Sequence, residues 1–154
     1  MALYEQIDQD LVTARKERDE TRLSTLGLLK TEVVKAAKEP GATGADDDLV
    51  LRVLRKEVKR REEAAKVYDT AGRAESARRE EAEAAVLREY LPAELDEAQL
   101  EREVRAAIDE VRPQGPRDFG AVMKAASARL AGRAEGGRVA TAARRLMGEM
   151  RGSE

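Results

Sequence analysis

The chain has 154 residues, with 29 Lys or Arg against 31 Asp or Glu, and it contains no cysteine or histidine. The missing cysteines and histidines exclude disulfides, thiolate nucleophiles, Ser-His and Cys-His catalysis and most zinc sites. Charged residues make up 39% of the sequence and aromatic residues 3%, so Leu, Val and Ala must build the core, as in closely packed amphipathic helices.

The first half of the chain predicts four helices that pair into two hairpins. Apolar residues at helical spacing predict a helix over residues 3–17 and a second from Glu20 to the breaker segment EPGATG. Asp46 is the expected N-cap of a third helix that runs to Thr70. A fourth helix stops at Leu91–Pro92, because proline disfavours helical geometry in the preceding residue. The residues expected to face inward are Leu3, Ile7, Leu11, Leu26, Leu29, Val33, Ala37, Val50, Leu54, Val58, Ala65, Tyr68, Ala82, Val86, Leu87 and Tyr90.

The segment LPAELDEAQL, residues 91–100, predicts a joint between two domains. Asp96 and Gln99 are spaced for a capping box, in which each side chain satisfies the other residue's backbone N–H. Leu95 before the cap and Leu100 after it match the hydrophobic-staple pattern. We therefore expect an N-terminal domain of two helix hairpins over residues 1–92 and a C-terminal three-helix domain over residues 93–154.

Three shorter helices are predicted in the second half, which makes the expected fold class all-α. The fifth helix starts after the capping box and ends at RPQGP, the sixth runs from Arg117 to about Ala131, and the seventh follows the link GRAEGG. The residues expected to face inward are Leu100, Val104, Ala107, Ile108, Val111, Phe119, Val122, Met123, Ala126, Leu130, Val139, Ala143, Leu146, Met147 and Met150.

Positive charge is concentrated at the C-terminal end. Residues 112–151 contain nine basic side chains against three acidic ones, a surplus of six in a chain whose net charge is −2. Such a local field predicts an anionic partner, either RNA bound through its phosphates or shape, or an acidic protein surface. Aromatic stacking platforms are lacking in this segment, so base-specific reading of a single strand is not expected. The candidate binding residues are Lys124, Arg129, Arg133, Arg138, Arg144 and Arg145.

The remaining candidate sites favour structural roles. The basic segment over residues 52–61 is interleaved with glutamates, which is typical of an exposed helix surface. The glycines of PGATG and GRAEGG follow helices, so they indicate caps and turns, and no phosphate-binding loop is recognised. The sequence thus predicts no cofactor and no metal site, and it has no apolar run long enough to cross a membrane.

The segment GAVMKAASARLAGRAEGGRV, residues 120–139, resembles the tail motif of the B subunit of the tRNA-dependent amidotransferase. The rest of the chain resembles the stand-alone YqeY proteins, through residues 3–33 and through EEAEAAVLREYLPAEL at residues 80–95. The chain departs from the family pattern at Glu135, where Asp or Asn is frequent, and at Gly27, where a larger residue is usual. The tail motif is carried by Gly120, Val122, Met123, Lys124, Ala125, Gly132, Arg133, Ala134 and Val139.

The resemblance implies an all-helical protein with a tRNA-facing module, but without the glutaminase and kinase-like domains that perform the amidotransferase chemistry. Within the motif, Val122, Met123 and Val139 are expected in the core, Gly120 where helices approach closely, and Gly132 at a helix C-cap. Lys124 and Arg133 are the first candidates for RNA contacts.

The leading hypothesis is a non-catalytic, cytoplasmic protein whose C-terminal domain binds tRNA or another structured RNA. It requires that carboxylates of the first domain leave the basic side chains free. One alternative is an adaptor that docks on a translation or amidotransferase complex. A third is a carbon–nitrogen ligase that uses glutamine as amido donor, an activity associated with the shared domain.

Overall fold

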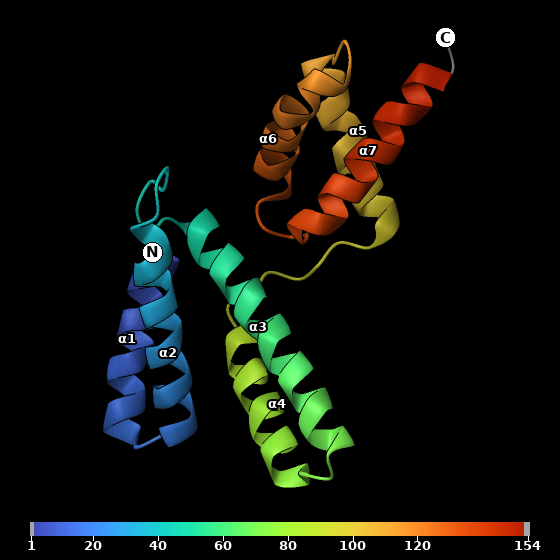
Figure 1. The fold of residues 1–154 in the computed structure, drawn as a ribbon. Coiled ribbons are helices and arrows are strands. Elements are labelled where there is room, and N and C mark those ends of the chain that lie inside the picture. The colour runs from blue at the N-terminus through green and yellow to red at the C-terminus, as the bar shows by residue number, and fades with distance from the viewer. Residues whose placement is uncertain (1, 153–154) are drawn as a thin grey trace. The chain divides into compact units, whose positions relative to one another are not determined.

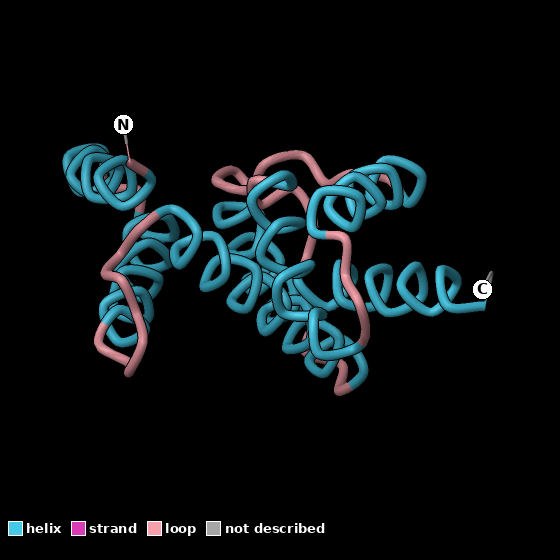
Figure 2. Tube along the Cα trace, turned by 90° about the horizontal axis from the view of Figure 1, so that it is seen from above, coloured by secondary structure: helices cyan, strands magenta, loops and turns pink. Residues whose placement is uncertain are grey.

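The computed structural model describes residues 2–152, and the side chains of residues 2–150. These residues form seven α-helices and one short 3-10 turn without any strand, which confirms the predicted all-α fold (Figure 1; Figure 2). The elements in chain order are α1 (Leu3–Glu17), α2 (Glu20–Ala37), α3 (Asp47–Thr70), α4 (Ala74–Arg88), α5 (Glu97–Val111), the 3-10 turn η1 (Pro116–Asp118), α6 (Phe119–Leu130) and α7 (Gly136–Gly152).

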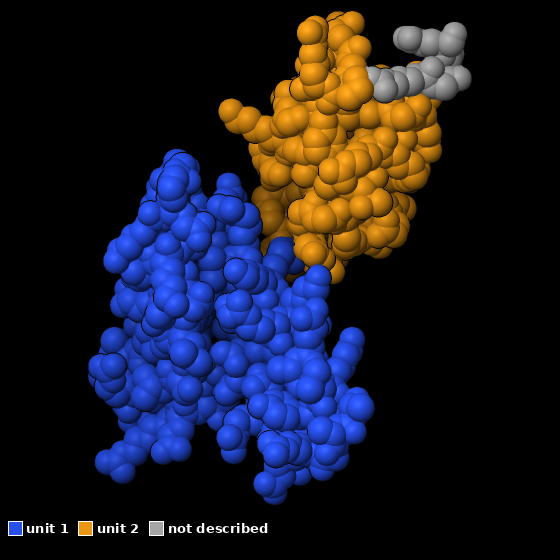
Figure 3. All heavy atoms as spheres, viewed as in Figure 1, with its two compact units in different colours: residues 1–91 blue, residues 92–154 orange. Residues whose placement is uncertain are grey.

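The chain divides into two compact units, residues 1–91 and 92–154, shown in blue and orange in Figure 3. Each unit has its own hydrophobic core. The first core is built by Ile7, Leu26, Leu29, Val33, Leu49, Val50, Leu51, Val53, Leu54, Val58, Val86, Leu87 and Tyr90. The second is built by Leu100, Val104, Ala107, Ile108, Val122, Ala126, Leu130, Ala134, Val139, Ala142, Ala143 and Leu146.

Two helix hairpins make up the N-terminal unit, α1 with α2 and α3 with α4 (Figure 1). The predicted N-cap of α3 is confirmed: the Asp46 carboxylate accepts a hydrogen bond of 2.9 Å from the Leu49 backbone N–H. Arg61 on α3 is largely buried and forms ion pairs with Glu80 and Glu83 on α4. Part of the basic segment over residues 52–61 therefore holds the two helices of this hairpin together.

The end of α4 is anchored to the first hairpin by the residues that follow it. The helix ends at Arg88, three residues before the predicted stop. Arg22 on α2 donates to the Glu89 carboxylate at 2.7 Å, and the Tyr90 hydroxyl donates to Asp10 on α1. Burial, with the bond to Asp10, raises the pKa of Tyr90, so this hydroxyl keeps its proton. Glu89 and Tyr90 thus attach the last residues of the N-terminal unit to both α1 and α2.

The joint between the units is ordered by α5 and the loop between α6 and α7. The predicted capping box is present: the Asp96 carboxylate accepts from the Gln99 N–H at 2.8 Å, and the Gln99 side chain accepts from the Asp96 N–H at 3.0 Å. The Leu95 N–H donates to the Arg133 carbonyl at 2.9 Å. Leu95 also packs against the second core. The connector from this leucine onward is therefore held by the C-terminal unit itself.

Two residues expected in the core are exposed instead. Ala82 lies outside the stripe of α4 that packs inward through Ala84 and Leu87. Alanine is small and occurs on both buried and exposed helix faces, so Ala82 did not indicate which face of α4 packs inward. Met150 is 44% exposed, because α7 extends past Leu146, its last buried residue among the described side chains.

The boundaries of α6 differ slightly from the prediction. The 3-10 turn at residues 116–118 replaces the predicted first turn, and α6 begins at Phe119. At the other end the C-cap is Ala131, with a φ of 49°, and Gly132 follows with a φ of 79°. The prediction of Gly132 as the cap was therefore wrong by one residue. Glycine is needed directly after the cap because the chain stays left-handed for a second residue.

Candidate nucleic-acid interface

The six predicted binding residues all lie on α6, on α7 or in the loop between them. Lys124 and Arg129 belong to α6, and Arg133 lies in the loop. Arg138, Arg144 and Arg145 belong to α7. The structure brings them into one unit but gives them different surroundings.

Helix α5 and its connector carry the opposite charge. Residues 92–111 contain seven acidic side chains and two basic ones, so residues 92–154 contain eleven of each. Because α5 packs on both α6 and α7, its carboxylates lie beside several of the predicted binding arginines. The C-terminal unit is thus neutral in sum, and the surplus of six over residues 112–151 overstates its positive field.

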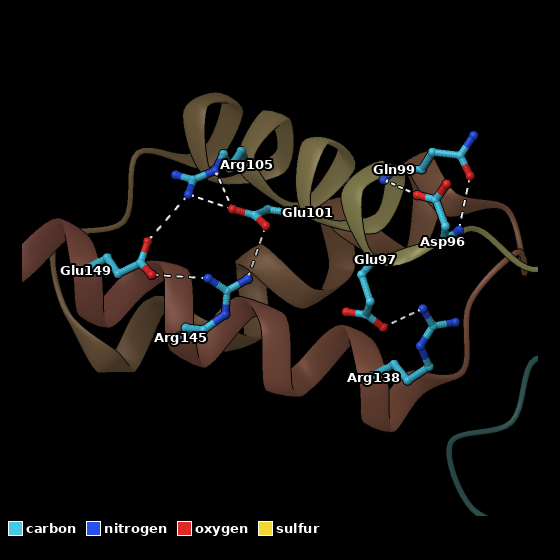
Figure 4. Close-up of polar contacts among 8 residues, drawn as sticks. All are labelled: Asp96, Glu97, Gln99, Glu101, Arg105, Arg138, Arg145 and Glu149. Carbon is cyan, nitrogen blue, oxygen red and sulfur yellow. Dashed lines mark hydrogen bonds and ion pairs between the residues drawn. The ribbon is translucent and has the colours of Figure 1, made fainter.

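Arg138 is held at the start of α7 by the connector and by the first turn of α5. Its guanidinium donates to the Glu97 carboxylate at 2.7 Å (Figure 4). It also donates to the Leu95 carbonyl at 3.1 Å. The Glu94 carboxylate lies 3.5 Å away. The Arg138 side chain is only 27% exposed. It is therefore a structural clamp between α7 and the joint.

Arg145 belongs to a closed ring of two arginines and two glutamates that joins α5 to α7 (Figure 4). Arg105 lies 2.7 Å from Glu101 and 3.4 Å from Glu149. Arg145 lies 3.3 Å from Glu101 and 3.1 Å from Glu149. The hydrogen bond from Arg105, and then the charge of Arg145, lower the pKa of Glu101. Each charge in the ring thus faces two opposite charges.

Two further predicted residues have partners within the same unit. Arg129 pairs with Glu103 on α5 at 3.2 Å. Arg133 donates to the Leu130 carbonyl at 2.9 Å and to the Arg129 carbonyl at 3.2 Å, so it closes the C-terminal end of α6. A positive charge at this end of α6 is stabilised by the negative end of the helix dipole. No carboxylate among the described residues pairs with Arg133.

The other two predicted residues have no carboxylate partner in the part of the chain that the structure describes. Lys124 is exposed on α6. The Arg144 guanidinium lies over the Phe119 ring, 4.8 Å from its centroid. Arg112 and Arg117, two exposed arginines in the connection from α5 to α6, also lack a carboxylate partner among the described residues. The prediction had not included them among the binding residues. We call Arg112, Arg117, Lys124, Arg133 and Arg144 the uncompensated cations.

The family motif forms mainly core. Val122 and Val139 are buried and Met123 packs against the same core, which confirms their expected inward positions. Ala134 is buried as well. Gly120 does not mark a close approach of helices, contrary to the prediction. It is exposed, and a Cβ atom built there would meet no atom within 4 Å. Gly120 and Lys124 have the four-residue spacing of one face of α6, and Arg117 precedes the helix in the 3-10 turn.

No group of three or more potential metal ligands occurs among residues 2–150. None of the described helices is both long enough and apolar enough to cross a bilayer.

Comparisons with known proteins agree with the resemblance to the YqeY proteins. A curated relative, an uncharacterized protein of Schizosaccharomyces pombe, is 35% identical over 86 residues, which cover 56% of this chain and 69% of the relative. The model of the Yqey-like protein family matches residues 4–147, and so extends through both units. The chain therefore belongs to the YqeY-like protein family.

Proposed function

We propose that this chain is a non-catalytic, cytoplasmic protein whose C-terminal unit binds the phosphate backbone of tRNA or another structured RNA. The observation that carries the proposal is the set of uncompensated cations, Arg112, Arg117, Lys124, Arg133 and Arg144. Their charges remain available to an anionic partner, whereas Arg129, Arg138 and Arg145 already have carboxylate partners. The resemblance of residues 120–139 to the amidotransferase tail supports the choice of tRNA.

The surface around Gly120 suits a phosphate backbone. Arg117 in the 3-10 turn and Lys124 on α6 are exposed on either side of this glycine in the sequence, and a Cβ atom built at Gly120 would meet no atom within 4 Å. Contacts of this kind fix position without reading sequence, so binding should depend on charge more than on base identity. With three to five phosphate contacts, the slope of log Kobs against log salt concentration should be about −2 to −4.

The test is a gel-shift titration against total tRNA at two salt concentrations. The variant R117E/K124E/R144E should lose binding, because three of the uncompensated cations become anions. The control R15E/R78E/R79E has the same change in net charge, but its exposed arginines lie on the N-terminal unit. It should bind as the parent does.

The proposal fails if the first variant retains the affinity of the parent, or if both variants lose binding equally. Should the parent bind no RNA but retain protein partners after nuclease treatment, the chain is an adaptor instead. Release of ammonia from glutamine by the pure protein would contradict its non-catalytic character.

A further inference from the structure

A surface pocket of about 360 Å³ lies within the C-terminal unit, between the start of α6 and the last part of α7. Its lining residues are Pro116, Phe119, Arg144, Met147 and Gly148. Phe119, Met147 and Pro116 give it apolar walls, and Arg144 supplies the single charge. Ligand pockets with mainly apolar walls and a few polar groups start at about this size. A ligand that suits this pocket has a flat or apolar body and an attached anionic group.

The Arg144 guanidinium makes a cation–π contact in the wall of this pocket. It lies 4.8 Å from the centroid of the Phe119 ring, and it lacks a carboxylate partner among the described residues. The neighbouring Arg145 is instead bonded to Glu101 and Glu149. A guanidinium on an aromatic ring has its plane partly desolvated on one side, and its other side can stack on a second flat group.

Gly148 leaves the pocket open on the side of α7. A Cβ atom built at this position would meet no atom within 4 Å, so the packing of the unit does not require a glycine. A glycine inside a helix costs roughly 1 kcal/mol relative to alanine. Its absent side chain instead leaves space beside Phe119 and Arg144.

We propose that this pocket takes one unstacked base of a bound RNA, stacked on Arg144, with the adjacent phosphates near Arg117. This inference rests on the proposed RNA binding, and it adds that the C-terminal unit recognises an unpaired base. A nucleotide combines a flat aromatic body with an anion, as the pocket requires. Arg117 directly follows the pocket residue Pro116 and is exposed, so a second cation is available to the backbone. Unpaired bases in RNA loops are commonly recognised by stacking on aromatic rings or on arginine planes.

The test compares two RNAs of equal length and charge, a hairpin with an unpaired loop that carries 2-aminopurine and a fully paired duplex. The parent should prefer the hairpin by roughly 5- to 150-fold, the range expected for one stacked base. The 2-aminopurine emission should change on binding. The variants R144K and F119L should lose both the preference for the hairpin and the emission change.

Gly148 provides a steric pair of variants. G148L should fill the pocket and abolish the preference without a change in charge, whereas G148A should retain it. R144K changes an exposed residue outside the core, so it remains informative if F119L weakens the fold.

The inference is overturned if the parent binds hairpin and duplex equally with a normal salt dependence, since backbone binding then stands without the pocket. It is also overturned if R144K and G148L both keep the preference for the hairpin. Failure of the parent to bind either RNA contradicts the proposed function itself.

Discussion

Arg145 on α7 lies 3.3 Å from the Glu101 carboxylate on α5, while Arg144, the residue before it, lies over Phe119. Two adjacent arginines therefore point to different surroundings and have different roles. Arg145 fixes α7 against α5, and Arg144 keeps its charge available at the surface. The same distinction separates Arg138 from Lys124, and it decides which variants are informative about binding.

Replacement of Arg138 by alanine should lower the free energy of unfolding by about 1 kcal/mol, since it removes hydrogen bonds to Glu97 and to the Leu95 carbonyl. Urea denaturation followed by circular dichroism measures the change. R144A is the matched control on the same helix and should unfold within about 0.5 kcal/mol of the parent. Equal destabilisation by both variants would contradict the clamp at Arg138.

The capping box should contribute measurably to the stability of the C-terminal unit. D96A removes the acceptor for the Gln99 N–H and should cost roughly 0.5–2 kcal/mol. Aspartate and asparagine both cap helices well, so D96N should cost much less than D96A. If D96A unfolded with the same urea midpoint as the parent, the first turn of α5 would not depend on this cap.

Helices, caps and cores could be predicted from the sequence because their signals are local. The spacing of Leu100, Val104 and Ile108 determines an inward face, and the pair Asp96 and Gln99 determines a helix start. Errors occurred where side chains were uninformative, as for Ala82, which is small enough for either face.

The candidate interface was harder to predict, because counting charged residues along the sequence does not show which of them form ion pairs in the folded protein. The surplus over residues 112–151 was counted without α5, whose carboxylates neutralise Arg129, Arg138 and Arg145. A count over residues 92–154 would have shown the neutrality, but not which arginines are paired. The contact of the Arg144 guanidinium with the Phe119 ring depends on the packing of α7 beside the start of α6, and no local sequence pattern predicts it.

Gly120 should tolerate alanine without loss of stability. A Cβ atom there would meet no atom within 4 Å, and alanine favours helix over glycine by up to about 1 kcal/mol. Thermal unfolding of G120A should therefore show an equal or higher Tm. A clearly lower Tm would restore the expectation that this glycine permits a close helix approach.

Acid should destabilise the protein through carboxylates that accept hydrogen bonds in the folded state. Hydrogen bonds from Arg105 lower the pKa of Glu101, and those from Arg22 lower the pKa of Glu89. The folded state thus binds protons less readily than the unfolded state. The resulting stability is complete above the unfolded value of about 4.3 and is lost as pH falls through the lowered folded values.

Urea midpoints measured from pH 7 down to pH 3 should therefore fall below about pH 4.3. The fall should be smaller for E101Q, which cannot titrate at this position. A midpoint that stayed constant down to pH 3, or an equal fall in E101Q, would contradict the role of the ring around Glu101.

The central claim, that the uncompensated cations and not the paired ones are available to RNA, is tested most directly by two neutralised variants in one tRNA-binding assay. R117Q/K124Q/R144Q should bind total tRNA at least 10-fold more weakly, and the magnitude of its salt slope should fall by about 2 to 3. R129Q/R138Q/R145Q removes the same charge from paired arginines and should have a lower Tm but nearly the affinity of the parent. Equal loss of affinity in both variants, or loss only in the second, would contradict the account.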